Sequence, residues 1–174
     1  MKTYLFIFLT LCVVTPHVCS AYTTSAQEAV QIDETTALFS ITFSFGLASR
    51  DVYLPIRAVR EQAWGEEVNT IGFTIVEDKV PHSEAGSAAG VVISDAEVVG
   101  GELYRVPAGT RETFTFYVVM KTEPDDLEAD YAVLVTDLPF YRGAEQEYQH
   151  LNPSELQYYQ TPETEFNSSN PSKN

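Results

Sequence analysis

A strict two-residue period of apolar side chains, starting at Phe39, is the feature that most constrains the fold of this chain. Residues 39–45 read FSITFSF, so that three phenylalanines and an isoleucine alternate with serine and threonine. In an extended chain this alternation places all the apolar groups on one face and all the hydroxyls on the other. The segment therefore predicts a half-buried β-strand, because an amphipathic helix would need a period near 3.6 residues.

Six further segments have strand character, at 52–58, 71–75, 89–99, 102–106, 113–120 and 131–135. Pro55 cannot donate to a ladder, so the segment 52–58 is expected at a sheet edge or with a bulge. The apolar phase of 89–99 slips near Asp95, as at a bulge, and the following Gly100–Gly101 pair indicates a hairpin. The segment 131–135 is apolar on both faces, which indicates a central strand.

Seven short strands separated by glycine, proline and aspartate turns predict an all-β fold, an antiparallel Ig-like β-sandwich with a closed barrel as the structural alternative. One short helical turn is expected near the C-terminus, where Asn152, Pro153 and Glu155 form a capping sequence. Leu151, Leu156 and Tyr159 would pin this turn to the sandwich.

The N-terminal segment predicts export, and the composition of the remaining chain predicts how the domain is bounded. Met1 and Lys2 precede an apolar run at 4–14 that is too short to span a bilayer, and small residues follow it, so 1–21 is predicted to be a signal peptide. Its removal takes away both cysteines and leaves no disulfide or thiol chemistry. Residues 22–36 are expected to be a polar leader that can lie along the domain, 37–160 the domain and 161–174 a disordered tail. The protein is expected to be secreted or to stay at the cell envelope, without membrane insertion after cleavage.

Charge restricts the choice of partners. The chain has 25 acidic and 10 basic residues, a formal net charge of −15. This balance argues against nucleic-acid binding and against adhesion to anionic lipid, since both need a basic surface. Cations, basic surfaces and neutral glycans remain as partners, and solubility outside the cell is the simpler use of the acidity.

One segment carries a family resemblance. Residues 106–135 combine a P-x-G-T turn, an alternating strand, an acidic corner, then Leu127 and Tyr131. They resemble the end of a bacterial immunoglobulin-like or fibronectin type III-like domain, in which a corner tyrosine bonds back across the turn. Tyr131 matches that tyrosine, whereas the Cys, Trp, Cys pattern of antibody domains is absent. The whole chain, including 39–56 and 151–159, resembles an uncharacterised family of small secreted bacterial proteins, which implies no known activity.

No sequence motif indicates catalysis. Beyond the signal peptide only His82 and His150 remain, each isolated in sequence and outside any hydrolase or phosphate-binding motif. We expect both to be exposed loop histidines, and the protein not to be an enzyme.

The acidic corner offers a candidate metal site. Asp125, Asp126, Glu128 and Asp130 supply the hard carboxylate oxygens that Ca²⁺ prefers, although the spacing is not that of an EF-hand. The alternative is a solvated acidic turn, and no other cofactor is indicated.

The aromatic residues offer the other candidate site. Trp64 lies in a loop, and a cluster of rings crowds the C-terminal third, namely Tyr141, Tyr148, Tyr158, Tyr159 and Phe166. Exposed rings would suit a glycan, whereas packing against the sandwich is their commoner use.

Two functions follow from these observations. The first is a secreted, non-catalytic and monomeric module with a structural or adhesive role, which binds an unknown protein or glycan partner. The alternative is a sandwich for glycan binding or calcium-dependent binding.

Overall fold

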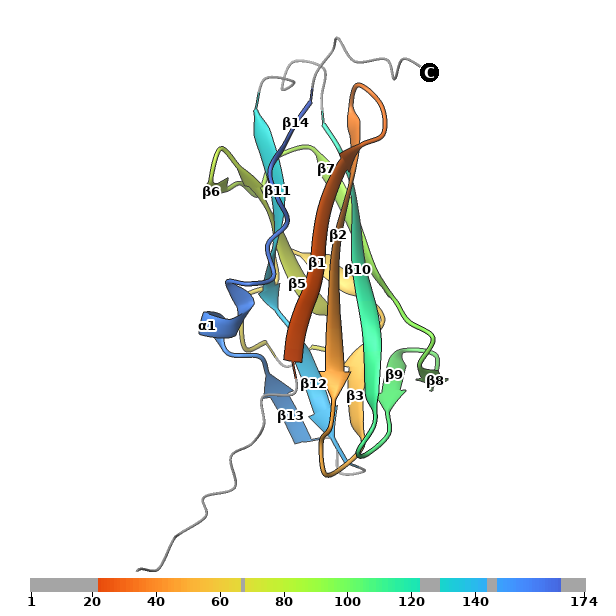
Figure 1. Cartoon of the computed structure of the whole chain (residues 1–174). Coiled ribbons are helices and arrows are strands. Elements are labelled where there is room, and N and C mark those ends of the chain that lie inside the picture. Colours follow the sequence, from red (N-terminus) through yellow and green to blue (C-terminus); the bar gives the residue numbers. More distant parts are fainter. Residues whose placement is uncertain (1–21, 67, 123–128, 144–146, 167–174) are drawn as a thin grey trace, which may run out of the picture.

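The predicted alternating strand is β2 (Thr36–Gly46), and it lies inside a four-stranded antiparallel sheet. The computed structural model describes residues 22–66, 68–122, 129–143 and 147–166. Sheet A contains β1 (Tyr22–Gln31), β2, β10 (Arg111–Lys121) and β7 (Ser87–Ile93), in that order. The long strands β1, β2 and β10 run side by side along the long axis of the molecule (Figure 1).

The opposite layer consists of two shorter sheets. Sheet B has the order β13 (Glu147–His150), β12 (Pro139–Arg142), β3 (Val52–Pro55), β9 (Leu103–Val106) and β8 (Glu97–Val99). Sheet C has the order β14 (Thr164–Glu165), β11 (Asp130–Asp137), β5 (Ile71–Glu77) and β4 (Ala58–Arg60), with β6 (Val80–Pro81) also paired to β5. Apart from the parallel β4–β5 pair, the strand pairs found in the described part of the chain are antiparallel.

Aromatic pairs join the two layers. Phe116 of sheet A meets Phe73 of sheet C with ring centroids 5.6 Å apart, and Phe45 of sheet A meets Phe140 of sheet B at 5.1 Å. The alternation of β2 is reproduced in its burial, since Phe39 and Phe43 are at most 1% exposed. The apolar faces of the two layers, sheet A on one side and sheets B and C on the other, pack against each other. This packing confirms the predicted all-β sandwich.

The chain passes directly from one sheet of the second layer to the other after β3 and after β11, and it returns to sheet C again through α1 between β13 and β14. Strand β3 ends at Pro55, and β4 begins three residues later in sheet C; likewise only Leu138 separates β11 from β12. Proline lacks the N–H that a continuous ladder would need, which favours a break at Pro55 and at Pro139. The segment 52–58 was predicted to lie at a sheet edge or to carry a bulge. The edge alternative is wrong for β3, which lies between β12 and β9, whereas β4 does lie at the edge of sheet C. The predicted strand 89–99 is likewise divided into β7 and β8.

Two local predictions are confirmed, one of a helix start and one of a hairpin. Helix α1 (Pro153–Leu156) begins after Asn152 with the expected capping box to Glu155. Strands β8 and β9 form the expected hairpin, with Gly100 and Gly101 at φ 63° and 76°. None of the described helices has the length and hydropathy needed for a membrane span.

The domain extends beyond the predicted limits of 37–160 at both ends. Residues 22–31 of the expected polar leader form β1, which pairs with β2 along its length. The sequence gives little sign of this strand, because the side chain that residues 26–31 pack against the core is the small Ala29. Residues 164–166 of the expected tail also belong to the fold, since β14 pairs with β11 and Phe166 is 1% exposed. The signal peptide and residues 167–174 lie outside the described residues.

Candidate functional site

Most of the predicted calcium site lies outside the described residues. Asp125, Asp126 and Glu128 belong to the segment 123–128, so this prediction stays open. Asp130 begins β11, where its backbone N–H donates to Oδ1 of Asp78 at 3.1 Å. Among the described residues no group of three or more potential metal ligands is found.

The two histidines differ from each other. His82 is half exposed and its Nδ1 lies against Oε2 of Glu77, which agrees with the prediction of an exposed histidine. His150 contradicts it: its side chain is only 14% exposed, and it lies at the end of β13. The reason is Asp137, whose fully buried carboxylate lies 2.8 Å from Nδ1 of His150.

A buried polar network surrounds Asp137 at the junction of sheets B and C. While Oδ1 contacts His150, Oδ2 accepts a hydrogen bond from Nε2 of Gln62 at 3.1 Å. Gln62 is fixed in turn by Thr70, whose hydroxyl donates to Oε1 and whose carbonyl accepts from Nε2. The network therefore holds the segment around Gln62 against the end of β11.

Trp64 comes two residues after Gln62 in the chain, and hydrogen bonding holds its side chain in one orientation. Its Nε1–H donates to the carbonyl of Leu151 at 2.8 Å, and its ring lies 5.8 Å from that of His150. The indole nevertheless remains 50% exposed. Because the only hydrogen-bond donor of the indole is occupied, the free part of the ring can offer a ligand only its π-surface.

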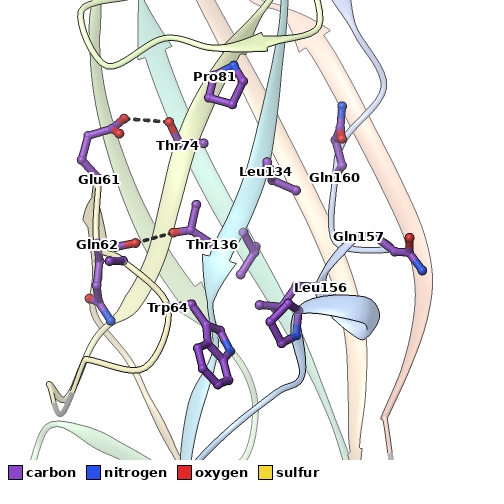
Figure 2. A pocket seen from close by; sticks show the side chains of 13 residues that line it. Glu61, Gln62, Trp64, Thr74, Pro81, Leu134, Thr136, Leu156, Gln157 and Gln160 are labelled. Carbon is purple, nitrogen blue, oxygen red and sulfur yellow. Dashed lines mark hydrogen bonds between the residues drawn. The ribbon is translucent and has the colours of Figure 1, made fainter.

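A groove of about 620 Å³ lies on the outer face of sheet C and ends at Trp64. Figure 2 shows Trp64 and Leu156 at one end and Pro81 at the other. The floor comes from β5 and β11, through Thr74, Leu134, Val135 and Thr136. The walls carry Glu61 and Gln62 on one side, and Gln157 and Gln160 on the other (Figure 2). Ala63 and Pro153 complete the lining.

Backbone hydrogen bonds fix both walls to the floor. On one side Glu61 donates its N–H to the carbonyl of Phe73 in β5 at 2.8 Å. On the other side the chain after α1 runs along β11, where Val135 donates to the carbonyl of Tyr159 at 3.0 Å. The backbone that carries both walls is thus tied to the floor of the groove.

Glu61 is the one ionisable side chain among the described residues that line the groove. Its Oε1 accepts a hydrogen bond from the hydroxyl of Thr74 at 2.7 Å and lies 3.4 Å from Nε of Arg60. The remaining polar groups of the lining are hydroxyls and the amides of three glutamines. The groove is therefore nearly neutral, although the chain as a whole is strongly acidic.

The ionisable groups whose pKa values are shifted lie outside the groove. The pKa of Asp33, in the turn between β1 and β2, is lowered first by the hydrogen bond from the backbone N–H of Thr35. The pKa of Asp51 is lowered, first by the hydrogen bond from the backbone N–H of Ala108 and then by Arg105. The same contact with Asp51, followed by one with Glu97, raises the pKa of Arg105. The shifts of Asp51 and Arg105 accompany a cross-strand ion-pair network, so they indicate local stabilisation rather than a reaction site.

The aromatic cluster of the C-terminal third is mostly structural. Tyr141, Tyr159 and Phe166 are at most 8% exposed, which confirms the packing interpretation for these three. Tyr131 is fully buried against Phe166, with ring centroids 5.3 Å apart, and its role as a corner tyrosine stays a prediction. Trp64 was recognised as a loop residue, whereas the glutamines of the groove carry no signal in the sequence.

A scan against protein-family models and a search of curated proteins found no match to this chain.

Proposed function

We propose that the protein is a secreted, non-catalytic binding module that holds a neutral glycan in the groove on the outer face of sheet C. The observation that carries this proposal is the half-exposed indole of Trp64 at the end of this groove. This function combines the adhesive module expected from the sequence with its glycan-binding alternative.

The lining of the groove suits a sugar chain. A pyranose ring has an apolar C–H face that stacks on an indole, and Trp64 is already oriented by its bond to Leu151. Hydroxyls on the edge of the ring need partners that both donate and accept, and the side-chain amides of Gln157 and Gln160 can do both. Both glutamines line the wall opposite Gln62 (Figure 2).

Charge favours a neutral glycan over an acidic one. The net charge of −15 repels anionic polysaccharides over distances of about a Debye length, roughly 8 Å at physiological ionic strength. The groove provides no positive charge among its described lining residues to offset that repulsion. Stacking and neutral hydrogen bonds would therefore provide the affinity.

The chemistry of Glu61 supports binding rather than hydrolysis. Glycoside hydrolysis normally uses two carboxyl groups on opposite sides of the scissile bond. Glu61 is the one carboxylate of the described lining, and it is engaged by Thr74 and Arg60.

The test uses the one tryptophan of the chain as a reporter. Fluorescence excited at tryptophan wavelengths reports on Trp64 alone, so a sugar stacked on it should shift and saturably change its emission. The probes are neutral hexasaccharides of β-1,4-linked glucose, xylose and N-acetylglucosamine, with polygalacturonate as the anionic comparison. We expect binding of at least one neutral probe and none of the anionic one.

Variants locate the site by calorimetry, which does not depend on the reporter. Trp64→Ala should abolish binding and Gln157→Ala should weaken it about tenfold, the loss of one or two hydrogen bonds. Tyr158→Ala is the matched control, because Tyr158 is 62% exposed but does not line the groove. Equal affinity in the wild type and Trp64→Ala, or no binding of any neutral probe, would contradict the proposal.

A further inference from the structure

The outer face of sheet A is unusual for so acidic a chain. Residues of this face alternate with the core residues along β1, β2, β10 and β7, so that Leu38 and Val119 point outward while Phe39 and Val118 are buried. The charged outward residues of these four strands are Glu28, Arg111 and Lys121. A single acid therefore lies on this face, out of the 25 in the sequence.

Apolar side chains cross this face from edge to edge. In the ladder, Val30 lies opposite Leu38, Leu38 opposite Val119, and Val119 opposite Ala89. Val30 is 53% exposed and Val119 is 46% exposed, so the row is open to solvent. On β7, Val91 and Ile93 extend it, at 43% and 55% exposed. Serine and threonine occupy most of the remaining outward positions of β2 and β10, and Tyr117 adds an aromatic ring opposite Val91, so the face is nearly uncharged.

From this distribution we infer that the outer face of sheet A binds a second copy of the same chain, face to face. Two molecules of net charge −15 repel each other on approaches that bring their acids together, and contact through this face, with two bases and one acid on each copy, avoids that repulsion. A patch of this kind pairs with itself about a two-fold axis, which closes the assembly at a dimer.

The size of the face agrees with a small dimer interface. Strands β2 and β10 each have 11 residues. At about 3.3 Å per residue and about 4.8 Å between strands, the four strands cover about 600 Å² in projection. Standard interfaces bury about 800 Å² per partner, and the weaker ones less. A reversible dimer with a dissociation constant in the micromolar range is therefore expected.

This inference is independent of the proposed function. The groove lies on the outer face of sheet C, in the layer opposite sheet A (Figure 1). A dimer formed through sheet A would leave both grooves open and turned away from each other. Such a molecule would be bivalent and would gain avidity on a repeating polymer.

Sedimentation equilibrium of the exported protein tests the inference, over about 1 µM to 1 mM. We expect the average mass to rise from monomer to dimer. Val119→Glu, which would place a carboxylate in the centre of the interface, should raise the dissociation constant at least about tenfold. Val59→Glu is the matched control, because Val59 is a strand valine with nearly the same exposure, 47%, on β4 of sheet C. It should dimerise like the wild type.

Other outcomes would overturn the inference. They are a wild type that stays monomeric throughout this range, a Val119→Glu variant that dimerises normally, and assembly that Val59→Glu abolishes equally. Added salt should strengthen the dimer by screening the net charge, whereas an interface built on ion pairs would be weakened. Equal melting temperatures of the two variants would show that Val119→Glu is folded. Because Trp64 lies outside the interface, its emission should not change with dimerisation.

Discussion

The buried carboxylate of Asp137 gives the sharpest prediction for stability. In Asp137→Asn one of the two acceptor oxygens becomes an amide donor. It must then face either Nε2 of Gln62, which is an amide donor, or Nδ1 of His150, which can accept from it only if the imidazole carries its proton on the other ring nitrogen. Gln62 cannot turn its amide over without losing both of its contacts with Thr70.

The magnitude follows from this geometry. If His150 changes its tautomer, bonds to a fully buried carboxylate become bonds to a neutral amide; if it does not, one buried donor is left without a partner. Such losses cost about 1–3 kcal/mol in the free energy of unfolding. In a chain of this size each kcal/mol lowers the melting temperature by about 3 °C, so a fall of about 3–9 °C is expected.

Urea denaturation followed by Trp64 fluorescence measures the effect, because the bond from Trp64 to Leu151 is broken on unfolding. Circular dichroism provides a second signal from the sheets. Asp130→Asn is the matched control, since it makes the same change on the same strand at an exposed position, and it should lower the stability by less than about 0.5 kcal/mol. A loss below that value in Asp137→Asn, or equal losses in the two variants, would refute the reasoning about the network.

Further predictions concern the turns, the ends and the charges. Gly46→Ala should destabilise the fold by about 2–3 kcal/mol, because its Cβ would lie 2.2 Å from the carbonyl oxygen of Thr110; Gly100→Ala, with no atom within 4 Å of the new Cβ, should cost only about 1 kcal/mol in chemical denaturation. Deletion of residues 161–174 should lower the free energy of unfolding by at least about 3 kcal/mol through the loss of Phe166, whereas deletion of 167–174 should leave the melting temperature unchanged. Equal melting temperatures of the two deletion variants would favour the shorter domain that ends at residue 160. Because the pKa of Asp51 is lowered in the folded state, its stabilising effect is present at neutral pH and disappears as the pH falls below 3.8; Asp51→Asn should therefore flatten the pH dependence of the urea midpoint in that acidic range, and an unchanged profile would contradict this. Calcium should raise the melting temperature no more than magnesium does at equal ionic strength, and a calcium-specific rise that Asp125→Asn/Asp126→Asn abolishes would establish the metal site instead.

The sequence determined those features that depend on neighbouring residues. The alternation at 39–45 is a property of consecutive side chains, and so it predicted β2 and the side of that strand that faces the core. The helix start at Asn152 and the hairpin at Gly100–Gly101 are equally local, because capping groups and positive φ angles act within a few residues. The all-β sandwich follows from a series of such local patterns.

The tertiary structure decided the features that depend on residues far apart in the sequence, namely strand pairing, burial and the groove. Strand β1 has little apolar periodicity of its own, and its place comes from the ladder with β2. The burial of His150 depends on Asp137 and Gln62, and Gln62 lies 75 residues from Asp137 in the chain. The groove depends in the same way on two segments that border sheet C from opposite sides. Because burial and electrostatic contacts are set by distance in space, no local pattern in the sequence contains them.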